Sequence, residues 1–142
     1  MRCAIGADDV GPLTEALLAE LELRGIAANR FGALQSPAEG EWASIGRAVG
    51  ETVAAGRADF GIVCCWTGTG ISIAANKVRG VRAALCADAE TAAGARRWND
   101  ANVLALSLRA TSPAVGLEIL AAFLASQASA ESADRRSIDA VE

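Results

Sequence analysis

Hydrophobic residues fall into short runs that alternate with longer amphipathic segments along the 142-residue chain. Short apolar runs between turn residues indicate buried strands, while apolar residues three or four positions apart indicate helices. The pattern predicts strands over 3–7, 26–31, 60–65, 81–86 and 102–107. It predicts helices over 12–24, 42–55, 71–78, 89–98 and 113–125, and a loop over 34–41.

Regular alternation of strand and helix is typical of a parallel sheet with helices on both of its faces. We therefore predict one α/β domain with a five-stranded parallel sheet, spanning residues 1–126. The segment 127–142 is polar and is predicted to form a short tail helix that packs on a partner subunit.

Composition and charge narrow the class of protein. The chain is 52% hydrophobic and 21% charged, which suits one compact domain with a single core. A net charge of −4 argues against a nucleic-acid partner, because binding phosphate backbones needs clustered Lys and Arg. No apolar run reaches the roughly 18 residues of a membrane span. An acidic pair, Asp8-Asp9, stands where a signal peptide would continue its apolar region, so we expect a cytoplasmic protein without a membrane partner.

The cysteines and the missing histidines limit the chemistry. Neither CxxC spacing nor any histidine accompanies the four cysteines, so we expect reduced thiols and no metal. The chain also has no tyrosine. Proton transfer must therefore be carried out by Cys, Asp, Glu, Lys or water.

Ligands of open α/β sheets collect at the carboxyl ends of the strands. We expect three groups at this edge: Asp8-Asp9 after the first strand, Cys65 with its Gly-Thr loop after the third, and Trp98-Asn99-Asp100 just before the fifth.

The loop 66–70 is a candidate anion site. Its glycines allow backbone amides to turn inward, and the following helix adds its positive N-terminal end. A tight strand-to-helix turn would use the same glycines, so the loop alone leaves both interpretations open. Cys65 favours a site, because a thiol beside a helix N-terminus can serve as a thiolate base or nucleophile. We expect Cys3, Cys64 and Cys86 to be small buried hydrophobes.

Three stretches, "CCWTGTGISIAANK", "GVRAALCAD" and "NDANVLALSLR", in this order and spacing, resemble ribose-5-phosphate isomerase type B and its galactose-6-phosphate isomerase relatives. The resemblance implies a three-layer α/β/α Rossmann-like domain and a homodimer, or dimer of dimers, with active sites between subunits. It also implies aldose–ketose isomerisation of a sugar phosphate through a cis-enediolate, without a cofactor.

The resemblance also assigns roles to residues. Cys65 matches the base that moves a proton between C1 and C2, and the loop that follows matches the one whose amides stabilise the enediolate oxygen. The loop positions are Thr67, Gly68, Thr69 and Gly70. Other matches to substrate-binding positions are Asp8, Trp42, Asn99, Arg109 and the tail residue Arg136. On this basis Trp98, Asn99 and Arg109 are expected from one chain, and Cys65 and Arg136 from another.

Four positions depart from the family pattern. The family usually has histidines where this chain has Asp9 and Trp98, a tail arginine where it has Ser132, and a glycine where it has Trp66. The histidine that the family has at the position of Trp98 is the one assigned to opening the furanose ring. Ring opening requires a proton transfer, and an indole cannot take up that proton.

We therefore expect Asp9, Trp66 and Trp98 to line a site with a substrate other than ribose 5-phosphate, a tetrose phosphate being favoured. A catalytically silent sugar-phosphate-binding subunit and an isomerase of an unphosphorylated sugar are the alternatives. Trp66 and Trp98 are equally compatible with packing at a subunit interface.

Overall fold

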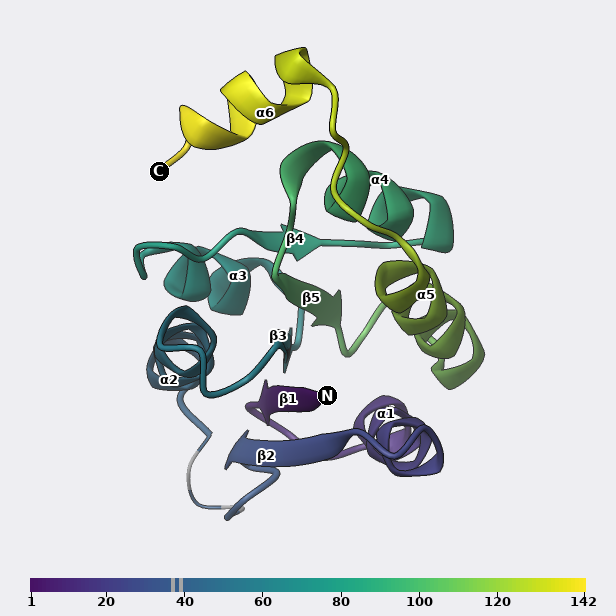
Figure 1. Ribbon diagram of the computed structural model, residues 1–142. Coiled ribbons are helices and arrows are strands. Elements are labelled where there is room, and N and C mark those ends of the chain that lie inside the picture. The colour runs from purple at the N-terminus through teal and green to yellow at the C-terminus, as the bar shows by residue number, and fades with distance from the viewer. Residues whose placement is uncertain (37, 39) are drawn as a thin grey trace.

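The computed structural model describes residues 1–36, 38 and 40–142, so Pro37 and Glu39 of the predicted loop lie outside the described residues. Its centre is a parallel sheet with the strand order β2-β1-β3-β5-β4 (Figure 1). The strands are β1 (Arg2–Ala7), β2 (Ala27–Gly32), β3 (Phe60–Cys65), β4 (Ala83–Leu85) and β5 (Val103–Ser107). The helices are α1 (Pro12–Leu23), α2 (Trp42–Ala54), α3 (Thr69–Asn76), α4 (Ala89–Asn99), α5 (Pro113–Ala125) and α6 (Ser132–Asp139). The predicted α/β/α fold with five parallel strands is confirmed.

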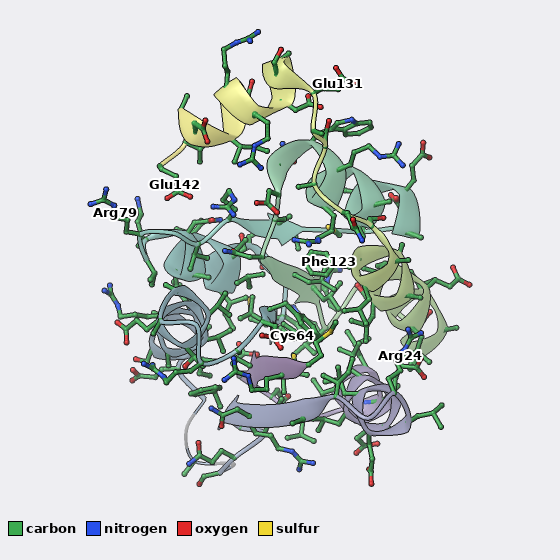
Figure 2. All side chains as sticks on the ribbon, in the orientation of Figure 1. Arg24, Cys64, Arg79, Phe123, Glu131 and Glu142 are labelled. Atoms are coloured by element: carbon green, nitrogen blue, oxygen red, sulfur yellow. The ribbon has the colours of Figure 1, made fainter. Side chains whose placement is uncertain are left out.

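Helices cover both faces of the sheet and enclose two apolar layers (Figure 1). Leu17, Leu120 and Phe123 belong to the layer beneath α1, α4 and α5. Val49 and Ile71 belong to the layer beneath α2 and α3. Figure 2 shows Phe123 and Cys64 inside the molecule, between the sheet and the first set of helices. No helix in the described part of the chain is long and apolar enough to cross a membrane.

The three central strands are buried along nearly their whole length, because each has a strand on either side and helices above and below. The edge strand β4 is shorter than predicted. At the start of β4, side-chain amides make the hydrogen bonds that a neighbouring strand would otherwise make. Asn102 Oδ1 accepts from Arg82 N at 2.8 Å, and Asn76 Oδ1 accepts from Ala83 N at 2.8 Å. Asn76 Nδ2 also donates to the Ala83 carbonyl at 2.9 Å, which closes the outer edge of β4 at this residue.

Strand register brings the carboxyl ends of the central strands to one level. Ala7 of β1 lies opposite Cys64 of β3, and Cys65 lies opposite Ser107 of β5. The segments that follow these strands therefore meet at one edge of the sheet.

The tail helix α6 lies over α4 of its own chain (Figure 1). Its Ile138 is buried, and Arg82 forms ion pairs with Glu142 and, at 3.2 Å, with Asp100. Packing of this helix on a partner subunit remains a prediction.

Candidate functional site

Asp8, Cys65 and the turn after β5 meet at the carboxyl edge of the sheet. The amide of Asp8 donates to the carbonyl of Cys64 at 3.3 Å, which places Asp8 beside the end of β3. Cys65 ends β3 and is 5% exposed. Its neighbour Cys64 belongs to the apolar layer on the opposite face of the sheet, as alternation along a strand requires.

The loop after Cys65 is fixed to the turn after β5. Leu108 N donates to the Cys65 carbonyl at 2.9 Å, and Arg109 N donates to the Trp66 carbonyl at 3.1 Å. The hydroxyl of Ser107 donates to the same Trp66 carbonyl at 2.9 Å and accepts from Ala110 N at 3.2 Å. Ser107, which no sequence motif singled out, is thus the link between the two segments.

Gly68 shapes the loop. It adopts the left-handed region with φ of 76° and is the N-cap of α3, which starts two residues earlier than predicted. The first bond of α3 runs from Ser72 N to the Gly68 carbonyl at 3.3 Å, so the amides of Thr69, Gly70 and Ile71 have no acceptor within the helix. These amides form the candidate anion-binding end of α3. The amide of Gly68 differs from expectation, because it donates to the Cys65 carbonyl at 3.2 Å.

Side chains of the loop and of α2 surround this helix end. The hydroxyls of Thr67 and Thr69 are hydrogen-bonded to each other, 2.7 Å apart, at the surface. The ring of Trp42, the first residue of α2, packs on the backbone of Gly70: a Cβ there would lie 3.1 Å from the nearest ring atom. Trp42 therefore stands beside the free amides of α3, and its role in lining a substrate remains a prediction.

Asp8 carries a carboxylate oxygen without a partner. Its Oδ1 is buried, and no donor among the described residues lies within hydrogen-bonding distance. Burial raises the pKa of Asp8, an effect that a backbone hydrogen bond opposes and the neighbouring Asp9 carboxylate reinforces. Asp9 itself is exposed, and its Oδ1 accepts from Val10 N at 2.8 Å. An unsatisfied buried acceptor beside Cys65 suits a ligand that brings a hydroxyl group.

We expect Asp8→Asn to raise the melting temperature at neutral pH while lowering kcat/KM about tenfold or more, since a hydrogen bond to a charged acceptor is lost. Because the folded-state pKa of Asp8 is raised, its ionisation opposes folding, and the wild type gains stability as pH falls through that pKa. The advantage of the variant should therefore shrink in acid. Thermal unfolding of both proteins from neutral to acidic pH measures this, and a pH-independent difference would contradict it.

Trp98 and Asn99 lie together at another place. A helix that returns from β4 to the start of β5 ends at the amino edge of the sheet, and Trp98 and Asn99 are its last turn. Six-residue β3, at about 3.3 Å per residue, separates the two edges by roughly 16 Å. The expectation that Trp98-Asn99-Asp100 shares an edge with Cys65 in one chain is therefore wrong.

The expected division of residues between subunits remains a prediction. Arg109 is bonded through its backbone to the Cys65–Trp66 segment of its own chain. Arg136 is exposed on α6, the helix that packs on α4. Within one chain, the backbone of Arg109 thus lies at the Cys65 loop.

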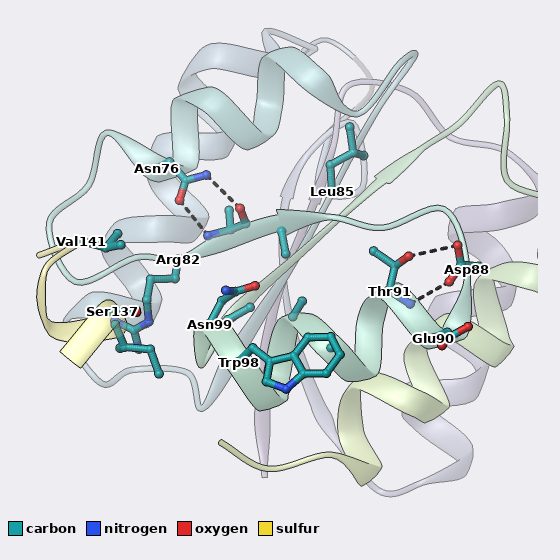
Figure 3. Close-up of a pocket in the computed structure, with 16 residues that line it drawn as sticks. Asn76, Arg82, Leu85, Asp88, Glu90, Thr91, Trp98, Asn99, Ser137 and Val141 are labelled. Carbon is teal, nitrogen blue, oxygen red and sulfur yellow. Dashed lines mark hydrogen bonds between the residues drawn. The ribbon is translucent and has the colours of Figure 1, made fainter. Parts of the chain in front are cut away.

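A hollow of about 750 Å³ extends along β4 between α3, α4 and α6 (Figure 3). Trp98, Asn99 and Leu85 are part of its lining. Leu85 also contacts the loop: a Cβ on Gly68 would lie 2.5 Å from Leu85 Cδ1. Leu85 therefore joins the two groups of residues, although its sequence position gave no signal of this.

The remaining thiols are packed in the interior. Burial raises the pKa of Cys64 to about 12 and that of Cys86 to about 11, and it also raises the pKa of Cys3. Neighbouring anionic groups add to each of these shifts. These three cysteines are small buried side chains, as expected, which leaves Cys65 as the thiol at the edge.

Comparison with known proteins shows the family and the fold. The family model described as Ribose/Galactose Isomerase matches residues 3–141. Ribose-5-phosphate isomerase B of Clostridium thermocellum superposes with a TM-score of 0.92 at 35% identity, covering 99% of this chain and 95% of that one.

Two curated relatives differ in their named substrates. The D-erythrulose-4-phosphate isomerase of Pectobacterium atrosepticum is 33% identical over 122 residues, 85% of this chain and 80% of the relative. The galactose-6-phosphate isomerase subunit LacB of Clostridium acetobutylicum is 47% identical over 79 residues, 56% of this chain and 46% of the relative. The chain thus spans about half the length of LacB, and likewise 53% of a second curated relative. With a family match over residues 3–141 and the same fold, the chain belongs to the ribose/galactose isomerase family.

Proposed function

We propose that the protein interconverts an aldose phosphate and a ketose phosphate, with Cys65 as the base and a cis-enediolate as the intermediate. The observation that carries the proposal is the unpartnered Asp8 oxygen next to Cys65 and the free amides of α3. Such a reaction needs three groups: a thiol base, an anion-binding helix end, and a carboxylate that can accept a hydrogen bond from a substrate hydroxyl.

In this reaction the Cys65 thiolate removes the proton from the carbon beside the carbonyl. The electron pair of that C–H bond forms the C1–C2 double bond, and the carbonyl oxygen takes up the negative charge. Amides of Thr69, Gly70 and Ile71 stabilise this oxygen. The thiol then returns the proton to the neighbouring carbon while the hydroxyl proton passes between the two oxygens, so no cofactor is required.

Phosphate recognition is assigned to two arginines. Arg109 is exposed beside the Cys65 loop, and Arg136 is exposed on α6, which packs on α4. Because these groups lie at opposite edges of one chain, we infer that a second copy completes the site, as a homodimer or a dimer of dimers. Sugar phosphates are intracellular metabolites, which fits a cytoplasmic enzyme.

The favoured substrate is a tetrose 4-phosphate. Pentose and hexose phosphates are mostly closed rings in water, and opening the ring needs a proton relay that the indole of Trp98 cannot supply. A tetrose 4-phosphate has its terminal oxygen esterified and cannot close a furanose. Bulk from Trp66 and Trp42 suits a short carbon chain, and the Pectobacterium relative is named for erythrulose 4-phosphate.

We expect kcat/KM to be highest for erythrose or erythrulose 4-phosphate, lower for ribose 5-phosphate and lowest for free sugars. Trp98→His should raise the ribose 5-phosphate value selectively, about tenfold or more, because general acid–base groups contribute such factors. Coupled assays on purified wild type and variant measure both.

Efficient wild-type turnover of ribose 5-phosphate would contradict the choice of substrate. Preference for an unphosphorylated sugar would contradict the assignment of Arg109 and Arg136 to phosphate recognition. Binding of sugar phosphates without any turnover would identify a silent subunit instead of an enzyme.

A further inference from the structure

Arg82 joins three segments of the chain at the amino edge of the sheet. It directly precedes β4, and its side chain is 18% exposed. Its Nη2 donates to Asp100 Oδ2 at 3.2 Å and its Nε to the Asp100 carbonyl at 2.9 Å, while Nη1 donates to Glu142 Oε1. One guanidinium group thus bonds both the C-cap residue of α4 and a residue of the tail that follows α6.

Asn102 fixes the backbone from which this side chain extends. Its Oδ1 accepts from Arg82 N at 2.8 Å, and its amide donates to the Arg82 carbonyl at 3.0 Å. Asn102 Nδ2 also donates to the Gly80 carbonyl at 2.8 Å. Because the backbone of Arg82 is already fixed, less conformational freedom is lost when its planar guanidinium binds the two carboxylates.

Asp100 has an unusual backbone conformation. Its φ of 45° lies in the left-handed region, which no other non-glycine residue adopts in the described part of the chain. Aspartate tolerates this region better than most residues, but the conformation still needs support. Besides Arg82, Arg96 supplies that support: its Nη1 lies 3.5 Å from Asp100 Oδ1 and also donates to the Ala101 carbonyl. Asn99 directly precedes Asp100, so the way in which α4 ends at Asn99 depends on these bonds.

Few residues hold the tail on α4. Ile138 is the one buried residue of α6, and it lines the hollow along β4 together with Arg82 (Figure 3). Before α6, Ser129 N donates to the Arg97 carbonyl at 2.7 Å. A helix of eight residues is too short to be stable alone in water. The ion pair between Glu142 and Arg82 is therefore a substantial part of what keeps α6 in place.

We propose that Arg82 is a positioning residue for substrate binding: by bonding Asp100 and Glu142 together, it sets where Asn99 and Arg136 stand relative to each other. The inference rests on the proposed function, because it takes Asn99 on α4 and Arg136 on α6 as substrate-binding groups.

The bonds of Arg82 suit this role better than direct contact with a phosphate. Its Nε, Nη1 and Nη2 all donate to oxygens of the protein. Two carboxylates, those of Asp100 and Glu142, also offset its single positive charge. Arg82 therefore acts through the two segments that it joins.

Hydrogen exchange measures how firmly the tail is held. Glu142→Gln should speed amide exchange in residues 132–139 about two- to fivefold, since a partly exposed ion pair is lost. Arg82→Gln should have at least this effect, and combining the two should add little, because both remove the same contact. Asp139→Asn, which neutralises an exposed carboxylate of α6 outside the Arg82 network, is the matched control and should leave exchange unchanged.

Substrate affinity measures the positioning itself. In the Cys65→Ala background, Arg82→Gln should raise the Kd of erythrose 4-phosphate about tenfold, measured by titration calorimetry. Asp100→Asn and Glu142→Gln should each raise it by a smaller factor, since each frees only one of the two segments. Arg82→Lys keeps the charge but loses the planar fork, so it should weaken binding about as much as Arg82→Gln. In proteins that retain Cys65, KM should rise while kcat stays within about threefold, because the loop at the opposite edge is unchanged.

Full affinity in Arg82→Lys would show that Arg82 attracts the phosphate by its charge. Wild-type affinity in folded Arg82→Gln and Asp100→Asn would show that the network only stabilises the fold. Either result would overturn the inference, and turnover by the wild type would then leave the proposed function standing. A wild type that binds erythrose 4-phosphate with the expected dependence on Arg82, but does not isomerise it, would support the inference and remove the proposed function.

Discussion

Replacing Cys65 by alanine is expected to lower kcat by about 10²- to 10⁴-fold, the factor that a positioned general base contributes. KM should change little, because the loop amides, Asp8 and Arg109 remain. Turnover of erythrose 4-phosphate measures the loss. Deuterium uptake from solvent into the substrate separates proton abstraction from later steps, and the variant should lose this exchange together with turnover.

Cys64→Ala is the matched control, one residue earlier on the same strand. Cys64 is fully buried among α1, α4 and α5, on the face away from the loop. Its removal should cost about 1 kcal/mol of unfolding free energy, as expected for one small buried group, and should leave kcat within a few-fold of wild type. Equal activity of Cys65→Ala and wild type would remove the proposed mechanism.

The fold could be predicted because its central strands are easily recognised in the sequence. β1, β3 and β5 are buried on both faces and therefore consist of continuous apolar runs. The edge strands gave weaker signals. β2 has mostly exposed side chains, and β4 shortens to Ala83–Leu85 because Asn76 and Asn102 take over its hydrogen bonds. The pattern of apolar residues does not reveal that side chains replace the hydrogen bonds of a strand here.

The position of Asp8, Cys65 and the following loop at the carboxyl edge could also be predicted, since these residues follow directly from strand ends. The location of Trp98 was predicted wrongly although topology determines it: a residue just before a parallel strand lies at the amino edge. The backbone of Arg109 is held by bonds between the turn after β5 and Trp66, which link segments far apart in sequence. Ser107 and Leu85 act through contacts between segments far apart in sequence, so no motif could reveal them.

Gly68→Ala should reduce kcat by about 10²-fold or more, because it displaces the amides that face the enediolate oxygen in the proposed mechanism. Gly68 has φ of 76°, where an alanine costs about 1–2 kcal/mol. Its Cβ would also lie 2.9 Å from the backbone carbonyl of Leu106. Side chains can move aside, but this strand backbone cannot, so the loop itself must shift.

Gly80→Ala separates backbone strain from loss of the loop. Gly80 has φ of 84°, and a Cβ there would meet nothing within 4 Å. Backbone strain should lower the unfolding free energy of this variant by the same amount, about 1–2 kcal/mol, while its activity is kept. Adding Leu85→Ala to Gly68→Ala should not restore turnover, since the Leu106 backbone would still be in the way. If Gly68→Ala were as active as Gly80→Ala at equal folded fraction, the free amides of α3 would have no part in the reaction.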